Sequence, residues 1–258
     1  VILPESLEKI GDNAFRYTAQ SENDRAWLKR VHIPKNVKSI GTGAFAHNGL
    51  SQYVSIESLT FAEDSKLETI GAYAFNGNHL LKKVVLPDNV SEIGAGAFSW
   101  CIAIEEIVLP AALKTLHNNT FSGLRNLKRF VMQEGLEIIE RDAVSCEVGG
   151  DNWNLTELII PSTVRAIHDR AFAGMHGLQT VTFAEGSTMK SIGDYAFCNC
   201  TALESISIPK SVQSLGKYAF QAISTRDLVL PASMMVVADY AFMRTSLQNL
   251  SFEEGSKL

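Results

Sequence analysis

Every proline of this chain is followed, eleven residues later, by a phenylalanine. Pro87 precedes Phe98, Pro209 precedes Phe220, and the offset holds for all 7 prolines. A fixed offset that recurs along a whole chain is typical of a repeat architecture, and the basic length of the repeat is 23 residues, as between Pro87 and Pro110. The chain is therefore expected to fold as a series of similar units.

The repeated unit reads L-x-x-V-x-I-P-x-x-V-x-x-I-G-x-x-A-F. It is clearest in the run Leu81, Val84, Leu86, Pro87, Val90, Ile93, Gly94, Ala97 and Phe98. Positions 4 and 6 share one face of a strand, and proline ends that strand because it has no N–H to donate. The two following aliphatic residues turn the chain back over the core. The glycine position is expected to need a positive φ or a close backbone approach.

One such unit cannot bury its own apolar residues, so the units must stack. Stacking predicts about ten coils in a single solenoid over residues 1–258, with parallel strands about 4.7–4.9 Å apart. Short 3₁₀ or α-turns are expected at G-x-x-A-F. Val144 replaces the phenylalanine in one degenerate unit. Both ends of the chain fall inside a repeat, and we therefore expect a fragment of a longer protein.

Composition excludes several classes of function. A net charge of −5 argues against a nucleic-acid partner, which normally meets a basic face. No apolar run approaches the roughly 18 residues that a membrane span needs, and no secretory leader opens the chain. The 4 cysteines are too few for a disulfide framework in a chain of this size, so buried free thiols are expected.

Four β-branched residues are the first candidate for a binding surface. The fifth position of the strand should point outward, and in consecutive units it is occupied by Val85, Val108, Val131 and Ile159. An exposed apolar stripe often marks a partner site. The alternative interpretations are that β-branched residues simply suit strands, or that a neighbouring segment covers them.

Charged pairs at strand positions two and three are the second candidate. Basic and acidic pairs alternate from unit to unit as Lys82-Lys83, Glu105-Glu106 and Lys128-Arg129. Neighbouring strands would place opposite charges side by side. The preferred interpretation is a self-paired ladder that keeps the strands in register, and the alternative is a zwitterionic surface for a polar protein.

Three insertions are the third candidate. Residues 16–27, 46–55 and 145–154 all precede a strand, so they should emerge along one edge of the solenoid. They carry the aromatic residues Trp27, Tyr53 and Trp153. Such loops could contact a partner, or the tryptophans could close the enlarged coils.

Catalysis is not expected from these residues. The 6 histidines are scattered without metal-ligand spacing, and no nucleophile elbow, P-loop or zinc-protease motif is present. Cofactors and metals are therefore not expected. His117 and His168 replace the turn glycine, for which a structural role is predicted.

The repeat resembles the BspA-like leucine-rich repeats, also called the Treponema pallidum type. The I-G-x-x-A-F element, as in Ile40-Gly41 to Phe45, carries the resemblance, and the pattern covers the chain from end to end. Departures occur at Val144, at Ala238 and at the glycine positions filled by His117, Glu140 and His168. The resemblance implies an α/β-class, right-handed, β-rich solenoid with its strands on a concave face. It also implies a secreted or surface-attached protein of bacteria or parasitic protists, linked to adhesion.

The sequence thus predicts a monomeric, non-enzymatic interaction module outside the cell. Its expected partner is a host extracellular-matrix or surface protein, bound by the concave face and the edge loops. One alternative is a structural spacer that displays another domain. The other is a carbohydrate-binding module, which would need exposed aromatic platforms.

Overall fold

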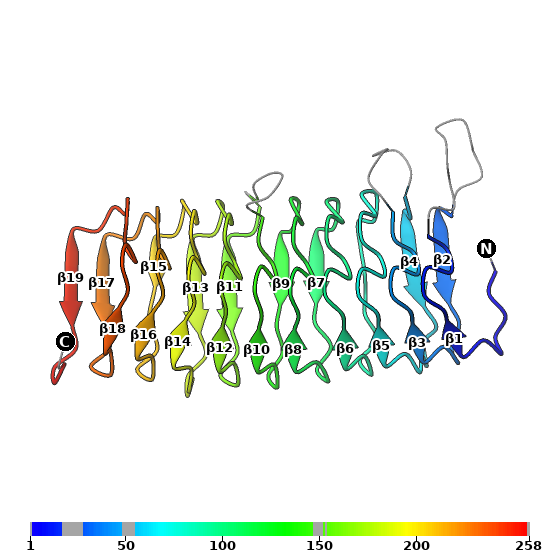
Figure 1. The fold of residues 1–258 in the computed structure, drawn as a ribbon, viewed down its shortest axis with the longest axis horizontal. Helices are drawn as coiled ribbons and strands as arrows, with labels where there is room; N and C mark the ends of the chain where they lie inside the picture. The colour runs from blue at the N-terminus through cyan, green and yellow to red at the C-terminus, as the bar shows by residue number, and fades with distance from the viewer. Residues whose placement is uncertain (1, 17–27, 48–54, 147–151, 153, 257–258) are drawn as a thin grey trace.

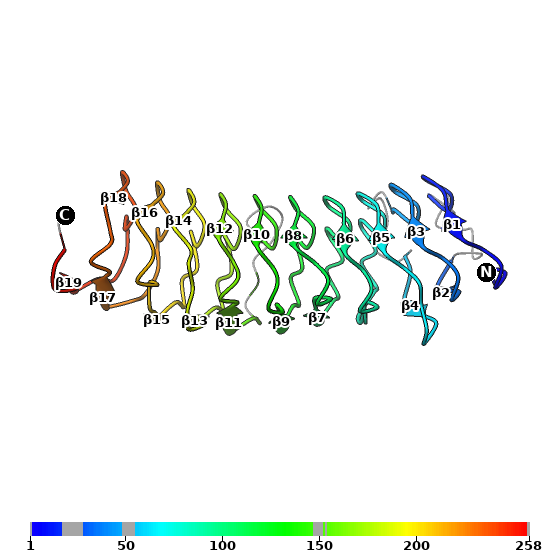
Figure 2. The same cartoon turned by 90° about the horizontal axis from the view of Figure 1, so that it is seen from below.

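The computed structural model describes residues 2–16, 28–47, 55–146, 152 and 154–256 of the chain. The chain winds into coils that stack side by side from the N-terminus to the C-terminus, in an elongated and only gently curved row (Figure 1, Figure 2). All strand pairs between neighbouring coils are parallel. The predicted leucine-rich-repeat solenoid is confirmed.

The predicted L-x-x-V-x-I strands form one row along the stack, which we call the first-strand row. Its strands are β2 (Arg30–Ile33), β4 (Ser58–Phe61), β7 (Glu106–Val108), β9 (Arg129–Val131), β11 (Glu157–Ile160), β13 (Thr180–Phe183), β15 (Ser205–Ile206), β17 (Asp227–Leu230) and β19 (Asn249–Phe252). In β11, burial alternates residue by residue, with Leu158 and Ile160 buried and Glu157 and Ile159 exposed. This alternation is the period-two pattern on which the sequence prediction rested.

A second row of strands follows the proline position of each coil. The second-strand row consists of β1 (Lys9–Ile10), β3 (Ser39–Ile40), β5 (Thr69–Ile70), β6 (Glu92–Ile93), β8 (Thr115–Leu116), β10 (Ile138–Ile139), β12 (Ala166–Ile167), β14 (Ser191–Ile192), β16 (Ser214–Leu215) and β18 (Val236–Val237). Sequence analysis assigned these residues to a turn. Two residues are too few to show an alternating pattern, so this row emerges only when the coils are stacked.

The G-x-x-A-F element forms β-turns, and no helix occurs within the described ranges. In one coil, Ala74 donates its N–H to the carbonyl of Gly71 at 3.2 Å, and Tyr73, the third residue of that turn, has a φ of 56°. A positive φ at this position is what a type II turn requires. The 3₁₀ or α-turns expected here are thus replaced by β-turns.

The glycine of this element serves close packing. A Cβ placed on Gly71 would lie 2.6 Å from the carbonyl carbon of Gly41 in the preceding coil. The positive φ falls two residues later in every described coil, at Asn13, Gly43, Tyr73, Gly96, Asn119, Asp142, Arg170, Tyr195, Tyr218 and Tyr240. Of the two reasons predicted for the glycine, close approach is correct and positive φ is wrong. His117 and His168 therefore occupy positions of ordinary φ.

Stacked phenylalanine rings fill the centre of the coils. Adjacent rings pack face to face with centroids 5.0–5.9 Å apart. The first run consists of Phe15, Phe45, Phe75, Phe98 and Phe121, and the second consists of Phe172, Phe197, Phe220 and Phe242. The runs are separated by the coil that contains Val144. In that coil Phe130 of β9 turns edge-on to Phe121, with ring centroids 5.7 Å apart.

Strand pairing between coils is interrupted at different places in the two rows. The first-strand row breaks between β4 and residues 82–86, between β9 and β11, and between β15 and β17. The second-strand row breaks only between β6 and β8. Each boundary between described coils therefore keeps at least one set of strand contacts.

Candidate functional site

The four β-branched residues of the candidate stripe lie on the outer face of the first-strand row. Val85 is 67% exposed, Ile159 62% and Val108 38%, while Val131 is half-buried. Strand pairing brings Val108 and Val131 side by side. Ile159 lies beyond the break between β9 and β11, so the stripe is divided rather than continuous. No segment within the described residues covers Val85 or Ile159.

The charged pairs form ion pairs across neighbouring strands. Lys128 Nζ lies 2.9 Å from Glu105 Oε2, and Arg129 pairs with Glu106. The hydrogen bond and positive charge of Lys128 lower the pKa of the Glu105 carboxyl. These contacts agree with the self-paired ladder that the sequence favoured.

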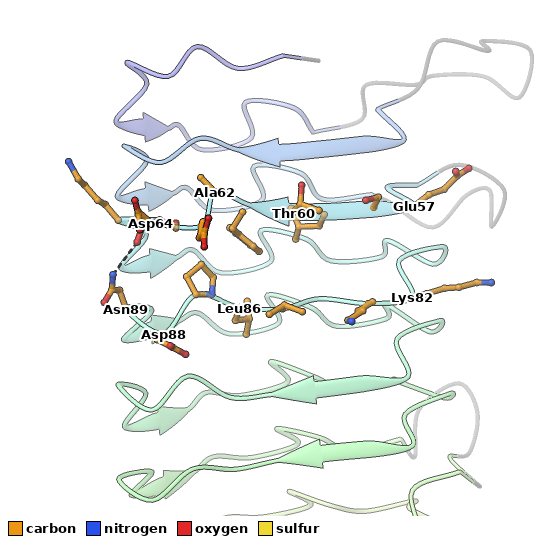
Figure 3. A pocket seen from close by; sticks show the side chains of 17 residues that line it. Glu57, Thr60, Ala62, Asp64, Lys82, Leu86, Asp88 and Asn89 are labelled. Atoms are coloured by element: carbon orange, nitrogen blue, oxygen red, sulfur yellow. Dashed lines mark hydrogen bonds between the residues drawn. The ribbon is translucent and has the colours of Figure 1, made fainter.

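Lys82 and Lys83 differ from the other charged pairs. Neither forms an ion pair with any residue in the described part of the chain. Both are exposed, and both line a groove of about 960 Å³ on the first-strand face. This groove lies between β4 and residues 82–89, where the first-strand row is interrupted (Figure 3).

A second groove adjoins the first. It has a volume of about 560 Å³ and is lined by Val85 and Leu86 from one coil, by Val108 and Pro110 from the next, and by Gln133. Val85 and Leu86 belong to both linings. Val85 and Val108 both line this second groove, where a partner can bury apolar surface.

The aromatic residues predicted on the edge loops cannot be placed. Trp27, Tyr53 and Trp153 all lie outside the described residues. Their proposed role in partner contact stays a prediction.

Sequence analysis missed a row of tyrosines along the turns. Tyr195, Tyr218 and Tyr240 stack with ring centroids 4.8 and 5.0 Å apart, and Arg170 lies 5.2 Å from the centroid of Tyr195. The signal was the repeated Y-A-F at consecutive turns. A sugar would bind to a ring face, and stacking covers most of these faces. Tyr240, at the end of the row, is 61% exposed and is the member of the row best placed for such a contact.

The histidines and cysteines lie in structural settings. His117 contacts Glu92 through Nε2 at 2.9 Å and Glu140 through Nδ1 at 3.2 Å, which ties three successive coils together. Burial lowers the pKa of His79, and nearby Arg125 lowers it further. All 4 cysteines are buried and none is in a disulfide, as predicted. Within the described ranges no group of histidine, cysteine and carboxylate side chains could hold a metal ion.

The fold and this surface together define a repeat solenoid that presents a long face of exposed strands. The chain belongs to the BspA-type leucine-rich repeat family, because the model described as "BspA type Leucine rich repeat region (6 copies)" matches residues 1–60, 50–147 and 151–257. No curated protein matches the chain. The described part of the chain contains no helix that could span a membrane.

Solved structures with a similar fold come from several bacteria. The leucine-rich repeat protein of T. pallidum is 25% identical, with a TM-score of 0.55 over 68% of this chain and 78% of that one. The leucine-rich cell surface protein of Faecalibacterium prausnitzii is 19% identical, with a TM-score of 0.45 over 96% of this chain and 83% of that one. The pneumococcal vaccine antigen PcpA is 16% identical, with a TM-score of 0.49 over 98% and 76%.

Proposed function

We propose that this chain is a non-enzymatic protein-interaction module of a secreted or cell-surface protein. It binds a host extracellular-matrix or surface protein through the first-strand face, with the edge loops contributing. The extracellular location follows from the resemblance to the BspA-like family, whose members are linked to adhesion. The chain acts as a monomer in this proposal.

The observation that carries the proposal is the exposed apolar surface beside the two grooves. Val85 and Val108 expose 67% and 38% of their surface on a face of short, regular strands. Exposed apolar side chains that line a groove are a candidate contact surface for a partner. The neighbouring ion pairs, such as Lys128 with Glu105, are already satisfied and would form a polar rim around it.

The proposal is tested by surface plasmon resonance against a panel of extracellular-matrix proteins and glycans. The variant V108K/V131E removes the apolar pair without placing like charges opposite each other. We expect it to weaken a saturable protein response at least tenfold, because it replaces apolar contact at the interface with charged groups that the partner would have to desolvate. Val229→Lys is the matched control, since Val229 is 53% exposed at the same strand position on β17.

Each outcome of this assay decides between the alternatives. Equal loss of binding in both variants would point to nonspecific charge repulsion and contradict the assigned site. Silence across the protein panel would favour the structural spacer. A response to glycans alone, lost in a Tyr240→Ala variant, would favour the carbohydrate-binding module.

A further inference from the structure

The wall of the larger groove formed by β4 has an unpaired backbone edge. Ser58 donates its N–H to the carbonyl of Lys29, and Ala62 donates to that of Ile33, so these residues face β2. Backbone groups alternate in direction along a strand, and Leu59 and Phe61 therefore direct their N–H and C=O groups toward the groove. No strand pairing joins residues 58–61 to residues 82–86 in the described chain.

The backbone of the opposite wall bonds to the next coil, and side chains tie the two walls together at both ends. Asn89 donates its side-chain amide to the carbonyl of Ser65, and Leu80 donates its N–H to Ser55 Oγ. Lys83 forms an isolated parallel bridge with Glu106, and Glu105 donates its N–H to the carbonyl of Lys82. On the far side of the coils, β5 and β6 remain paired. The groove is thus open on the first-strand face and closed on the second-strand side, and Figure 3 shows the two walls running alongside one another.

Charge differs between the two ends of the groove. At one end lie Lys82 and Lys83, together with Glu57, whose carboxylate pairs with Lys29 (Figure 3). At the other end lie Glu63, Asp64 and Asp88, together with Lys66, whose ammonium donates to the side chain of Asn36. Figure 3 shows Lys82 at the end opposite to Asp64 and Asp88. Asp64 pairs with Lys35, whereas Glu63 and Asp88 form no ion pair with any described residue.

We propose that this groove binds an extended peptide of a partner protein, which pairs with the free edge of β4 and places acidic residues against Lys82 and Lys83 and basic residues against Glu63 and Asp88. Strand addition to an unpaired edge is a common mode of peptide recognition, in which main-chain hydrogen bonds supply affinity. The four residues of β4 span about 13 Å of extended chain, so they could pair with about four residues at the centre of the peptide, whose ends would then reach the charged groups. This inference rests on the proposed function and names the form of its ligand.

The test is fluorescence anisotropy with a labelled peptide, KKTVTVEE. Two control peptides accompany it: the scrambled sequence TKEVVKET, and KKTVTVEE with alternate amides N-methylated. We expect saturable binding of the first peptide and at least tenfold weaker binding of both controls. Only the first peptide has both the basic-to-acidic order of charges and free main-chain N–H groups. Equal binding of all three peptides would show that net composition alone determines binding, and it would overturn the proposal. The absence of saturable binding of the first peptide would overturn it too.

Protein variants locate the site. Val85→Trp fills the groove from an exposed position, and K82E/K83E reverses the charge at the basic end; each should weaken peptide binding at least tenfold. Val229→Trp is the matched control and should bind as the parent does, with circular dichroism confirming the fold of every variant. Unchanged peptide affinity in the Val85→Trp variant would contradict the proposal that the peptide binds in this groove.

The two proposals can fail separately. If a panel protein binds and Val85→Trp leaves that binding intact, the peptide groove is wrong while the interaction module stands. If the peptide binds in the groove and the whole protein panel is silent, the groove stands and the matrix-protein ligand is wrong.

Discussion

The coil that interrupts the phenylalanine stack contains a compensating exchange of side chains. At the position of the stacked phenylalanines this coil has Val144, and in its first strand it has Phe130. The preceding coil has Phe121 and Ile107 at the same two positions. All four side chains are buried. Because Phe130 turns edge-on to Phe121, we infer that its ring fills the space that a phenylalanine at position 144 would occupy.

A double-mutant cycle measures this exchange. Val144→Phe alone should overpack the core and cost about 1–3 kcal/mol. Phe130→Ile alone leaves a cavity and should cost about 2–3 kcal/mol, somewhat less than a truncation to alanine. The variant F130I/V144F restores the arrangement of the neighbouring coil and gains ring stacking worth about 0.5–1.5 kcal/mol. It should therefore lie within about 1 kcal/mol of the parent, with a coupling free energy of about 3 kcal/mol.

Urea unfolding followed by circular dichroism gives the free energies. The denaturant dependence of the free energy must be the same in all four proteins, because repeat arrays can lose two-state behaviour. In a thermal scan, each single variant should melt roughly 4–8 °C below the parent. If the double variant loses the sum of the two single losses, the two side chains do not share one volume and the reasoning is wrong.

Three other predictions concern single residues. Burial lowers the pKa of His79 from its ordinary 6.5. The free energy of unfolding should therefore be constant above pH 6.5 as far as His79 is concerned and should fall at lower pH, where the imidazole takes up a proton in the unfolded chain but not in the folded one. The urea midpoint of a His79→Gln variant should fall less steeply with decreasing pH than that of the parent. Burial raises the pKa of the Cys101 thiol to about 12, so it should not react with a thiol reagent at neutral pH until urea unfolds the chain. A Cβ on Gly94 would lie 2.5 Å from the backbone nitrogen of Ala72, so Gly94→Ala should cost about 1–3 kcal/mol. Gly11→Ala, which meets nothing within 4 Å, is its control, and equal losses would contradict this assignment.

The repeat made most of the fold predictable. The proline–phenylalanine offset placed the first-strand row and the phenylalanine ladder, because both depend on residues that recur in nearly every coil. The second-strand row was missed since hydrogen bonds between coils create it. The exchange between Phe130 and Val144 was missed because each residue alone reads as a departure from the pattern.

The candidate surface was predictable only in part. Alternation along a strand placed Val85 and Val108 on the outer face, and alternation between coils paired Lys128 with Glu105. The groove could not be predicted, because it depends on where pairing between β4 and the next coil stops. Nothing in the repeat pattern marks that position.

The staggered breaks in the two strand rows have a mechanical consequence. Where β4, β9 or β15 ends its sheet, the second-strand row continues with β5–β6, β10–β12 or β16–β18, and where β6 ends its sheet, Lys83 bridges to Glu106. At each boundary between described coils, a force along the axis is therefore carried by at least one of the two strand rows. Along the stack the force passes from one row to the other. No boundary between described coils lacks a strand contact, so under shear the stack should lose coils from its ends before it splits in the middle.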